Sequence, residues 1–477
     1  MRGATAQGIP LRNLPLLFAD DSGLERMVLI VRTVHPGRTL EKPTLVADQP
    51  WEYLRVYVAT VHYNPAVRKF RMWYFARIRP SNAGGAGVES PDTKLLYATS
   101  DDGLRWDKPV LGLYAVGDST ANNVLEFEGG GGGEGNVMVD DEEADPARRY
   151  KLLLHNRRGY MAGYSADGIR WNEYSAKPVL AQGDTIKGTK NPSTGEYMAY
   201  HKRSAFVRGF PRRVVWLSRS RDFLTWSEPG LVFGADEADD EWSRGPEDRT
   251  EVYLMAVFPH AAGFIGFPSI FRHTPHIFKK EEVGATPTTG PMDIQLAASR
   301  DGKVWTRSWP RLAIIPRGAP GTFDGGSIYN TASEPVDVDG ETWLYYTAIN
   351  TGHGGPIPPK SVTIGRAQWR LHGFASLDAG PEGGSIETKP LRLGSPQLVV
   401  NADASRGRLQ VALLEADGRP ISGYSLNESD DFSSDSTRWI ARWKGKADVI
   451  TDRPVRVLFE MRSARLYSIS CPVPSKR

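Results

Sequence analysis

The 477-residue sequence contains a single cysteine, Cys471, so no disulfide can form within the chain. Its formal net charge is only +3, which is too small to indicate a nucleic-acid or membrane partner. No segment is long and apolar enough to span a membrane, and residues 1–15 lack the apolar core of a signal peptide. We therefore expect a soluble protein, cytoplasmic or exported, and these features leave its oligomeric state open.

Motifs of several enzyme classes are missing as well. The chain has no H-E-x-x-H pair, no cysteine cluster, no G-x-S-x-G and no phosphate loop. His62 and His155 lie within expected strands, and their spacing is not that of metal ligands. We accordingly expect no cofactor and no metal-ligating residues.

Turn-forming residues and tryptophan are plentiful. The chain contains 49 glycines, 34 prolines and 13 tryptophans, and no long helical pattern is present. Such a composition is typical of an all-β, turn-rich protein.

One heptapeptide pattern, S-x-D-G-x-x-W, indicates a repeat. It occurs at residues 100–106, 165–171 and 299–305, and a degenerate copy with Phe223 in the glycine place covers residues 220–226. Each copy follows an apolar run that reads as a strand, and Asp-Gly then turns the chain because glycine tolerates a positive φ. The copies lie roughly 55–80 residues apart, about the length of a four-stranded propeller blade with long loops. We expect the tryptophan to fill the groove between one unit and the next.

The apolar runs group into five units, which predicts an all-β fold: a five-bladed β-propeller followed by a C-terminal β-sandwich. The predicted domains are a lead-in over residues 1–50, with a ring-closing strand at 27–31, a catalytic propeller over 51–374 and an accessory sandwich over 375–477. The expected propeller strands are 54–63, 70–74 and 95–99; 136–139, 149–154 and 159–165; 185–188, 196–202 and 212–218; 251–258, 264–271 and 293–298; and 327–332, 343–349 and 361–367. The expected sandwich strands are 397–401, 408–415, 437–443, 455–460 and 464–470.

Carboxylates stand at or just before the innermost strand of four units. They are Glu52, Asp184, Glu251 and Asp324, while the second unit offers Asn136, with Asn122 and Asn123 in the preceding loop. Acids brought together at one end of a channel repel each other and raise a pKa, which suits an acid–base pair that cleaves a glycosidic bond. The alternative is structural: these acids cap turns or pair with arginines such as Arg55 and Arg249.

Residues near these acids suit a sugar-binding pocket. Aromatic rings can stack on a sugar face, and polar side chains can bond its hydroxyl groups; for each histidine, a structural role stays open. The expected substrate-binding residues are Asp48, Trp51, Asn123, His201, Lys202, Tyr253, Asp324 and His353.

The repeat hairpins, the count of five units and the trailing sandwich resemble the five-bladed propeller glycosidases, the superfamily of invertases, levansucrases, arabinanases and β-xylosidases. The W-[ML]-N-D-P, R-D-P and E-C motifs of invertases are absent, and D-Q-P-W-E at residues 48–52 is a distant counterpart. The resemblance implies three catalytic acids. These are Glu52 (or Asp48) as base or nucleophile, Asp184 as transition-state stabiliser and Glu251 as general acid, with Asp324 able to take a share.

The expected function is therefore that of a glycoside hydrolase with a carbohydrate as its partner. A non-catalytic carbohydrate-binding propeller is the alternative, and a protein-interaction propeller is a third reading. No nucleic-acid or membrane partner is expected, and a structural cation in the central channel stays open.

Overall fold

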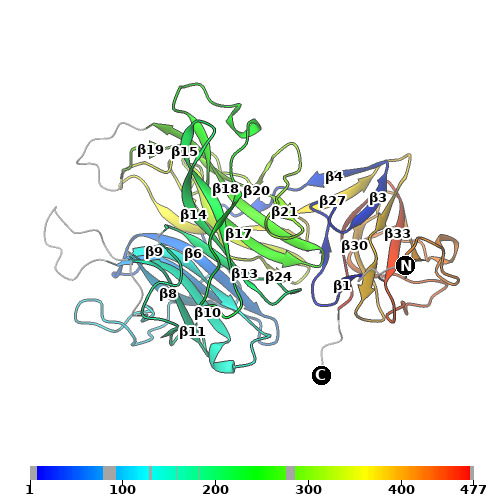
Figure 1. Ribbon diagram of the computed structural model, residues 1–477, viewed down its shortest axis with the longest axis horizontal. Coiled ribbons are helices and arrows are strands. Elements are labelled where there is room, and N and C mark those ends of the chain that lie inside the picture. Colours follow the sequence, from blue (N-terminus) through cyan, green and yellow to red (C-terminus); the bar gives the residue numbers. More distant parts are fainter. Residues whose placement is uncertain are drawn as a thin grey trace.

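The computed structural model describes residues 8–78, 93–127, 132–156, 158–181, 183–275 and 285–472. Within these ranges the chain is all-β, as the sequence predicts, and its helical segments are the short 3-10 turns η1 (Pro146–Arg148), η2 (Ala238–Asp240) and η3 (Leu426–Glu428). In the same ranges, no helix has the length and apolarity needed to cross a bilayer. Figure 1 shows the strands gathered into two lobes.

The larger lobe, here called the ring lobe, comprises residues 38–39 and 52–370. It consists of five consecutive groups of antiparallel strands, and a parallel bridge between β26 and β6 joins the last group to the first. The strands are β6 (Glu52–Asn64), β7 (Lys69–Ile78) and β8 (Thr93–Ser100); β9 (Gly132–Val139), β10 (Tyr150–Asn156), β11 (Gly159–Ser165) and β12 (Asn172–Glu173); β13 (Ile186–Lys190), β14 (Tyr197–Val207), β15 (Phe210–Ser220) and β16 (Gly230–Phe233); β17 (Arg249–His260), β18 (Gly263–Pro275), β19 (Thr288–Thr289), β20 (Met292–Gln295), β21 (Ala297–Ser299) and β22 (Ala313–Ile315); and β23 (Ser327–Thr331), β24 (Val336–Val338), β25 (Glu341–Ile349) and β26 (Val362–Arg370).

The first strand of each group forms a closed circle with the other first strands. β6 contacts β9, β9 contacts β13, β13 contacts β17, β17 contacts β23, and β23 contacts β6 again. Side chains at the beginnings of these five inner strands therefore converge, although their groups lie far apart in the sequence.

The repeated turns connect neighbouring groups. In each copy the aspartate accepts two backbone N–H groups; Asp102, for example, accepts those of Leu104 and Arg105 at 2.8 and 2.9 Å. The carbonyl of Gly103, which has a φ of 66°, accepts the hydroxyl of Tyr345 on β25 at 2.7 Å. The glycine carbonyls of the turns at residues 165–171 and 299–305 accept hydrogen bonds from side chains of β7 and β14. These turns thus dock on the preceding group, and the turn of the first group docks on the last.

Phe223 shows why glycine is used in the other three turns. Its φ is 64°, in the left-handed region that costs a non-glycine residue roughly 1–2 kcal/mol. Its ring is fully buried and packs edge-on against Tyr197 at 5.1 Å, with Tyr174 at 5.5 Å. Aromatic packing offsets the backbone cost at this position.

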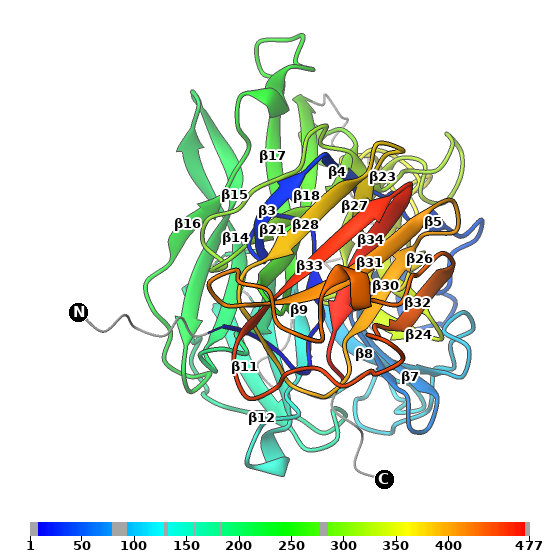
Figure 2. The same cartoon turned by 90° about the vertical axis from the view of Figure 1, so that its right-hand side faces the viewer.

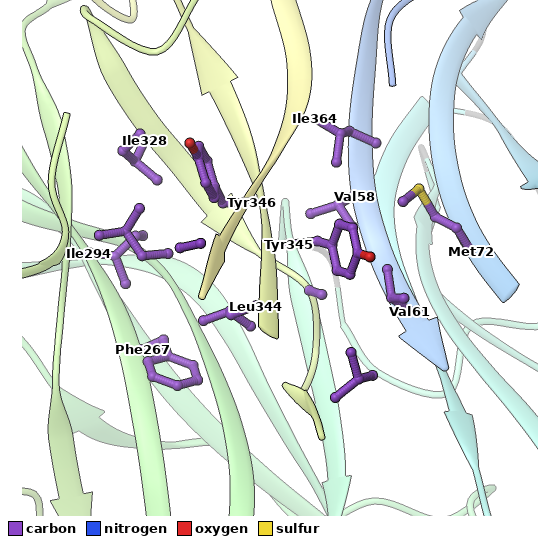
Figure 3. Packing of buried hydrophobic residues seen from close by; sticks show 14 of the residues in the cluster. Val58, Val61, Met72, Phe267, Ile294, Ile328, Leu344, Tyr345, Tyr346 and Ile364 are labelled. Carbon is purple, nitrogen blue, oxygen red and sulfur yellow. The ribbon is translucent and has the colours of Figure 1, made fainter. Parts of the chain in front are cut away.

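The apolar core of the ring lobe draws on several groups of strands. Figure 3 shows Val58 of β6, Ile294 of β20, Ile328 of β23 and Tyr346 of β25 pointing toward a shared interior. β-branched and aromatic residues are frequent in these strands because they pack well on a pleated surface.

The smaller lobe, here called the two-sheet lobe, combines both ends of the chain. Its two sheets pack on one hydrophobic core and face the viewer in Figure 2. One sheet contains β1 (Ile9–Leu11), β29 (Leu391–Leu393), β33 (Val455–Arg462), β28 (Gly384–Thr388), β3 (Leu24–Val28) and β31 (Arg408–Glu415), and the other contains β32 (Asp435–Ile440), β30 (Val399–Asp403), β34 (Ala464–Ser470), β27 (Ala375–Ala379), β4 (Ile30–Val34) and β2 (Leu16–Leu17).

The prediction of a ring-closing strand at residues 27–31 is wrong. Leu29 has a φ of 53°, and this left-handed residue separates β3 from β4. β3 pairs with β28 and β4 with β27, so both belong to the two-sheet lobe. The lead-in contributes to the ring lobe through β5 (Arg38–Thr39), which pairs with β26.

A cavity of about 600 Å³ lies where the far ends of the inner strands meet the N-terminal segment. Val139 of β9, Lys190 of β13 and Pro259 of β17 line it, together with Arg12 and Glu334. The beginnings of the inner strands lie at the other end of these strands, away from this cavity.

Candidate active site

Glu134, near the start of β9, is one of two carboxylates that meet at the beginnings of the inner strands. Its two oxygens accept hydrogen bonds from the hydroxyl of Tyr329 and the side-chain amide of Asn330, each at 3.1 Å. Burial and then the negative charge of Asp184 raise the pKa of Glu134 to about 7. A carboxyl group with this pKa can carry a proton at neutral pH and donate it to a substrate.

Asp184, two residues before β13, is the second carboxylate. It forms an ion pair with Lys202, and its side chain is 55% exposed. Burial acts to raise the pKa of Asp184, but the charge and hydrogen bond of Lys202, together with the charges of His155 and Arg213, leave this pKa below its ordinary value. The backbone N–H of Asp184 donates to the hydroxyl of Tyr160 at 2.9 Å, which fixes the chain before β13.

Two buried lysines accompany the carboxylates. The ammonium of Lys202 lies 3.4 Å from the ring centroid of Tyr253, which is a cation–π contact. Lys187 on β13 reaches β6, where it donates to the carbonyl of Ala59 at 2.9 Å. Burial lowers the pKa of Lys187 to about 7, while the charge of Glu134 acts in the opposite direction.

Aromatic rings surround the same charges. The ring centroid of Tyr329 lies 5.0 Å from that of Tyr253 and 5.6 Å from that of Tyr57. The ring of His353 is nearly parallel to that of Tyr329, at 6.2 Å and 10°, and its Nε2 lies 3.3 Å from the Tyr253 hydroxyl. Burial and then the charge of Lys360 lower the pKa of His353 to about 3, so its imidazole is neutral at pH 7.

Glu251, on β17, adjoins this group but is held by arginines. Its side chain is 1% exposed and accepts hydrogen bonds from Arg249 at 2.9 Å and from Arg213. The guanidinium of Arg213 in turn lies 5.3 Å from the ring centroid of Tyr253. Glu251 is therefore connected to Asp184 and Lys202 through Arg213 and Tyr253.

Glu52 belongs to a separate network. Its carboxylate accepts the backbone N–H groups of Asp48 and Gln49, the Lys108 ammonium at 2.7 Å and the Tyr74 hydroxyl at 2.7 Å. The side chain is fully buried. These bonds fix the turn that leads into β6, so the three predicted catalytic acids do not form one hydrogen-bonded group.

Three residues predicted to bind substrate share the Glu52 network. Asp48 pairs with Lys108 at 2.7 Å, and the Trp51 indole donates to the side chain of Asn123 at 3.0 Å. Asn123 is buried and donates to the Tyr74 hydroxyl. In the structure, each of the three stabilises the turn before β6.

His201 and Asp324 are also buried among protein groups. His201 Nε2 lies 3.3 Å from the Ser218 hydroxyl, and burial lowers the pKa of His201 to about 4. Asp324 accepts the Tyr346 hydroxyl at 2.9 Å and the Thr322 hydroxyl at 3.0 Å. Of the predicted site residues, the structure thus gathers Asp184, Lys202, Tyr253 and His353, with Glu251 at their edge.

Sequence reasoning assigned the second inner strand to Asn136 and missed Glu134. Asn136 exchanges hydrogen bonds with the backbone of Gly188, at 3.0 and 2.9 Å, and so joins β9 to β13. Glu134 lies two residues earlier, on the same face of the strand because side chains alternate. This period of two was the signal that could have identified it.

Among the residues that the structure describes, no group of three or more His, Cys, Asp or Glu side chains is placed so that it could hold an ion. The positive charges of Lys187 and Lys202 stand beside the carboxylates instead.

No family model and no curated protein matches the chain. Solved structures similar to it include a complex of BT0996 with RGII (15% identity, 70% of this chain and 92% of that one, TM-score 0.47) and a glycosyl hydrolase from Bacteroides ovatus (14%, 70% and 94%, TM-score 0.41). A fructofuranosidase from Schwanniomyces occidentalis complexed with fructosylnystose is also similar (10%, 90% and 96%, TM-score 0.40). This is the resemblance to glycoside hydrolases that the sequence led us to expect.

Proposed function

We propose that the protein is a glycoside hydrolase built as a five-bladed β-propeller with an attached β-sandwich, and that Glu134 and Asp184 are its reacting carboxyl groups. One observation carries the proposal. Two carboxyl groups lie near the beginnings of inner strands in contrasting surroundings: Glu134 accepts hydrogen bonds from the neutral side chains of Tyr329 and Asn330, whereas Asp184 forms an ion pair with Lys202. The raised pKa of Glu134 and the lowered pKa of Asp184 agree with this contrast. Hydrolysis of a glycosidic bond needs such a pair, one carboxyl protonated and the other ionised.

The propeller assignment rests on the closed circle of inner strands and on the repeated turns. Five groups each contribute an inner strand to that circle. Docking of the first group's turn on the last group, through Tyr345 and Gly103, fits a ring of blades.

In the proposed reaction, Glu134 donates its proton to the oxygen of the leaving sugar as the bond from that oxygen to the anomeric carbon breaks. Asp184 either removes a proton from the attacking water or bonds to the anomeric carbon before water releases the sugar. The rings of Tyr57, Tyr253 and Tyr329 adjoin these carboxyl groups, and aromatic side chains are suited to contact a sugar.

The other predicted acids have positioning or structural roles in this proposal. Glu251 orients Arg213 beside Tyr253 and is a positioning residue. Glu52 stabilises the turn before β6 through Lys108 and Tyr74.

The test compares Glu134→Gln and Asp184→Asn with wild type on a panel of glycans, measuring released sugars. We expect each substitution to lower kcat by about 10²–10⁴-fold, because each removes one partner of the acid–base pair. The control is Glu228→Gln, an exposed glutamate on the ring lobe, which should keep wild-type activity. Unchanged release of sugar by both site variants would reject the assignment.

A carbohydrate-binding propeller without turnover is the second candidate, because Asp184 and Glu251 are both paired with cations. It predicts saturable binding of a glycan by wild type, with no sugar released from that glycan on prolonged incubation. Release of sugar that depends on Glu134 would exclude it.

A further inference from the structure

This inference rests on the proposed function and concerns the sugar that the site accepts. Three residues with cationic side chains lie at the end of the ring lobe where the inner strands begin: Arg55 on β6, Arg77 on β7 and Lys360 just before β26. We call them the cation cluster. Glu134 acts electrostatically on one of them, Arg77. Arg55 is 8% exposed and Lys360 is 7% exposed, so two of the three charges are largely withdrawn from water.

Strand register brings the cation cluster together. Arg55 lies beside Val362 in the parallel bridge between β6 and β26, and Lys360 comes two residues before Val362. On the other side, Val56 pairs with Ala76, so Arg77 lies next to the irregular stretch of β6 that contains Arg55. The charges of Arg55 and Arg77 both act to lower the pKa of Lys360 after burial has done so, which agrees with this placement.

The cluster adjoins the proposed reacting groups. The Lys360 ammonium donates to the carbonyl of His353, whose ring stacks over Tyr329, and Tyr329 donates to Glu134. Glu134 and Tyr329 also act electrostatically on Arg77. The cluster is therefore connected to Glu134 through His353 and Tyr329.

Among the described residues, no carboxylate stands as a full counter-ion to these three side chains. Within the part of the chain that the structure describes, none of them forms an ion pair with a carboxylate, and the acid that acts on Arg77 is Glu134, which is only partly ionised at neutral pH. A buried charge without a partner is costly, and like charges add repulsion.

Buried cations elsewhere in the molecule are handled differently. Lys108 pairs with Glu52 at 2.7 Å, and Arg212 pairs with Asp240 at 2.8 Å. Arg366, which lacks a carboxylate, stacks on Trp343 at 3.8 Å. The cation cluster differs in that its members lie close enough to act electrostatically on one another.

We propose that the cation cluster binds the oxyanion of an acidic sugar, a carboxylate or a sulfate group, on the residue that is cleaved at Glu134 and Asp184. Two guanidinium groups and an ammonium can surround such an anion, since arginine presents paired N–H donors that match carboxylate and sulfate oxygens. Binding of the anion supplies the cation cluster with a counter-ion.

The test measures binding directly and does not depend on turnover. Sodium glucuronate and sodium sulfate are titrated into the full-length protein at pH 7, with glucose and with sodium chloride at matched ionic strength as controls, and followed by calorimetry and by the shift in Tm. We expect both anions to bind wild type and raise its Tm. Arg77→Gln should weaken the binding of each anion about tenfold or more, which corresponds to the loss of one charge-assisted contact. Arg300→Gln, at an exposed arginine of a repeat turn, should bind as wild type does.

Two further measurements separate this inference from the hydrolase assignment. Glu134→Gln should keep anion binding while losing hydrolysis, so a failed hydrolase test leaves the anion result readable. Without anion, Arg77→Gln should have a Tm equal to or above that of wild type, because it relieves repulsion. If the two anions bind wild type no more tightly than Arg77→Gln, or stabilise both proteins equally, the inference is overturned. A stronger response to glucuronate points to a uronic acid, and a stronger response to sulfate points to a sulfated sugar.

Discussion

Glu52 and Glu134 invite comparison because each stands near the start of an inner strand and each is surrounded by protein. Glu52 receives an ammonium, two backbone N–H groups and a tyrosine hydroxyl. Glu134 receives one tyrosine hydroxyl and one amide, and faces the negative charge of Asp184. A fully paired carboxylate stabilises its turn, whereas an under-paired one is left able to exchange a proton with a ligand.

The largest expected effect is on stability at Glu52. Replacing Glu52 by Gln leaves the buried ammonium of Lys108 with only the more exposed Asp48 as a charged partner, and breaking a buried pair costs up to about 3–5 kcal/mol. Urea denaturation measures the free energy of unfolding. The same change at Glu134 should leave stability nearly unchanged or raise it. An equal loss of stability at both positions would show that the two carboxyl groups do not differ in how well they are paired.

A double variant sharpens this point. Lys108→Met alone should also destabilise the protein, because it leaves the buried Glu52 carboxylate without its cation. The combination Glu52→Gln with Lys108→Met should recover roughly 1–3 kcal/mol relative to the sum of the single changes, since neither buried charge is then alone. Strict additivity of the three unfolding free energies would show that the pair is not coupled.

The pH dependence of stability should single out Glu134. Its pKa is raised in the folded protein from 4.5 to about 7, so the folded state holds a proton that the unfolded state has lost between these values. The stabilising effect of this proton is complete below pH 4.5 and disappears as the pH rises through 7. Relative to Glu134→Gln, wild type should therefore lose unfolding free energy between pH 5 and pH 8 in urea titrations. Parallel curves for the two proteins would contradict the raised pKa.

The smallest effect is expected in the repeated turns, a third setting for a carboxylate. Asp102 accepts two backbone N–H groups, and Asp102→Ala should cost about 1 kcal/mol, as the loss of a comparable cap does. Asp101, its neighbour, forms an exposed ion pair with Lys69, and Asp101→Ala should change stability by less than about 0.5 kcal/mol. Thermal unfolding of the two variants, measured in parallel, decides whether Asp102 of the repeated pattern contributes more to stability than its neighbour Asp101.

Local features of the sequence foretold much of the fold. Strands predicted at residues 159–165, 408–415 and 464–470 have the same bounds as β11, β31 and β34. Alternation of side chains and the turn-forming residues that flank a strand are properties of neighbouring residues, so they can be recognised without knowing the partner strand.

Features that depend on distant partners were harder to foresee. Nothing near Leu29 indicates that β3 and β4 pair with strands more than 340 positions later in register, such as Val28 with Ser385. Glu52 looked catalytic because its counter-ion, Lys108, lies 56 residues away. Asp184 could be predicted from its position before an inner strand. Its partner carboxyl group, Glu134, could be identified only from the structure, which shows that this residue of β9 contacts Tyr329.

The interlacing of the two chain ends bears on how the protein is made. β2 pairs with β34, with Leu16 opposite Ile469, so β2 lacks its partner until a strand about 450 residues later has been made. Until then the apolar side chains of Leu11, Leu16 and Phe18, all buried in the finished protein, lack their cover. A chain that ends before residue 464 therefore presents an open sheet edge, and its need for chaperones should fall only after β34 has left the ribosome.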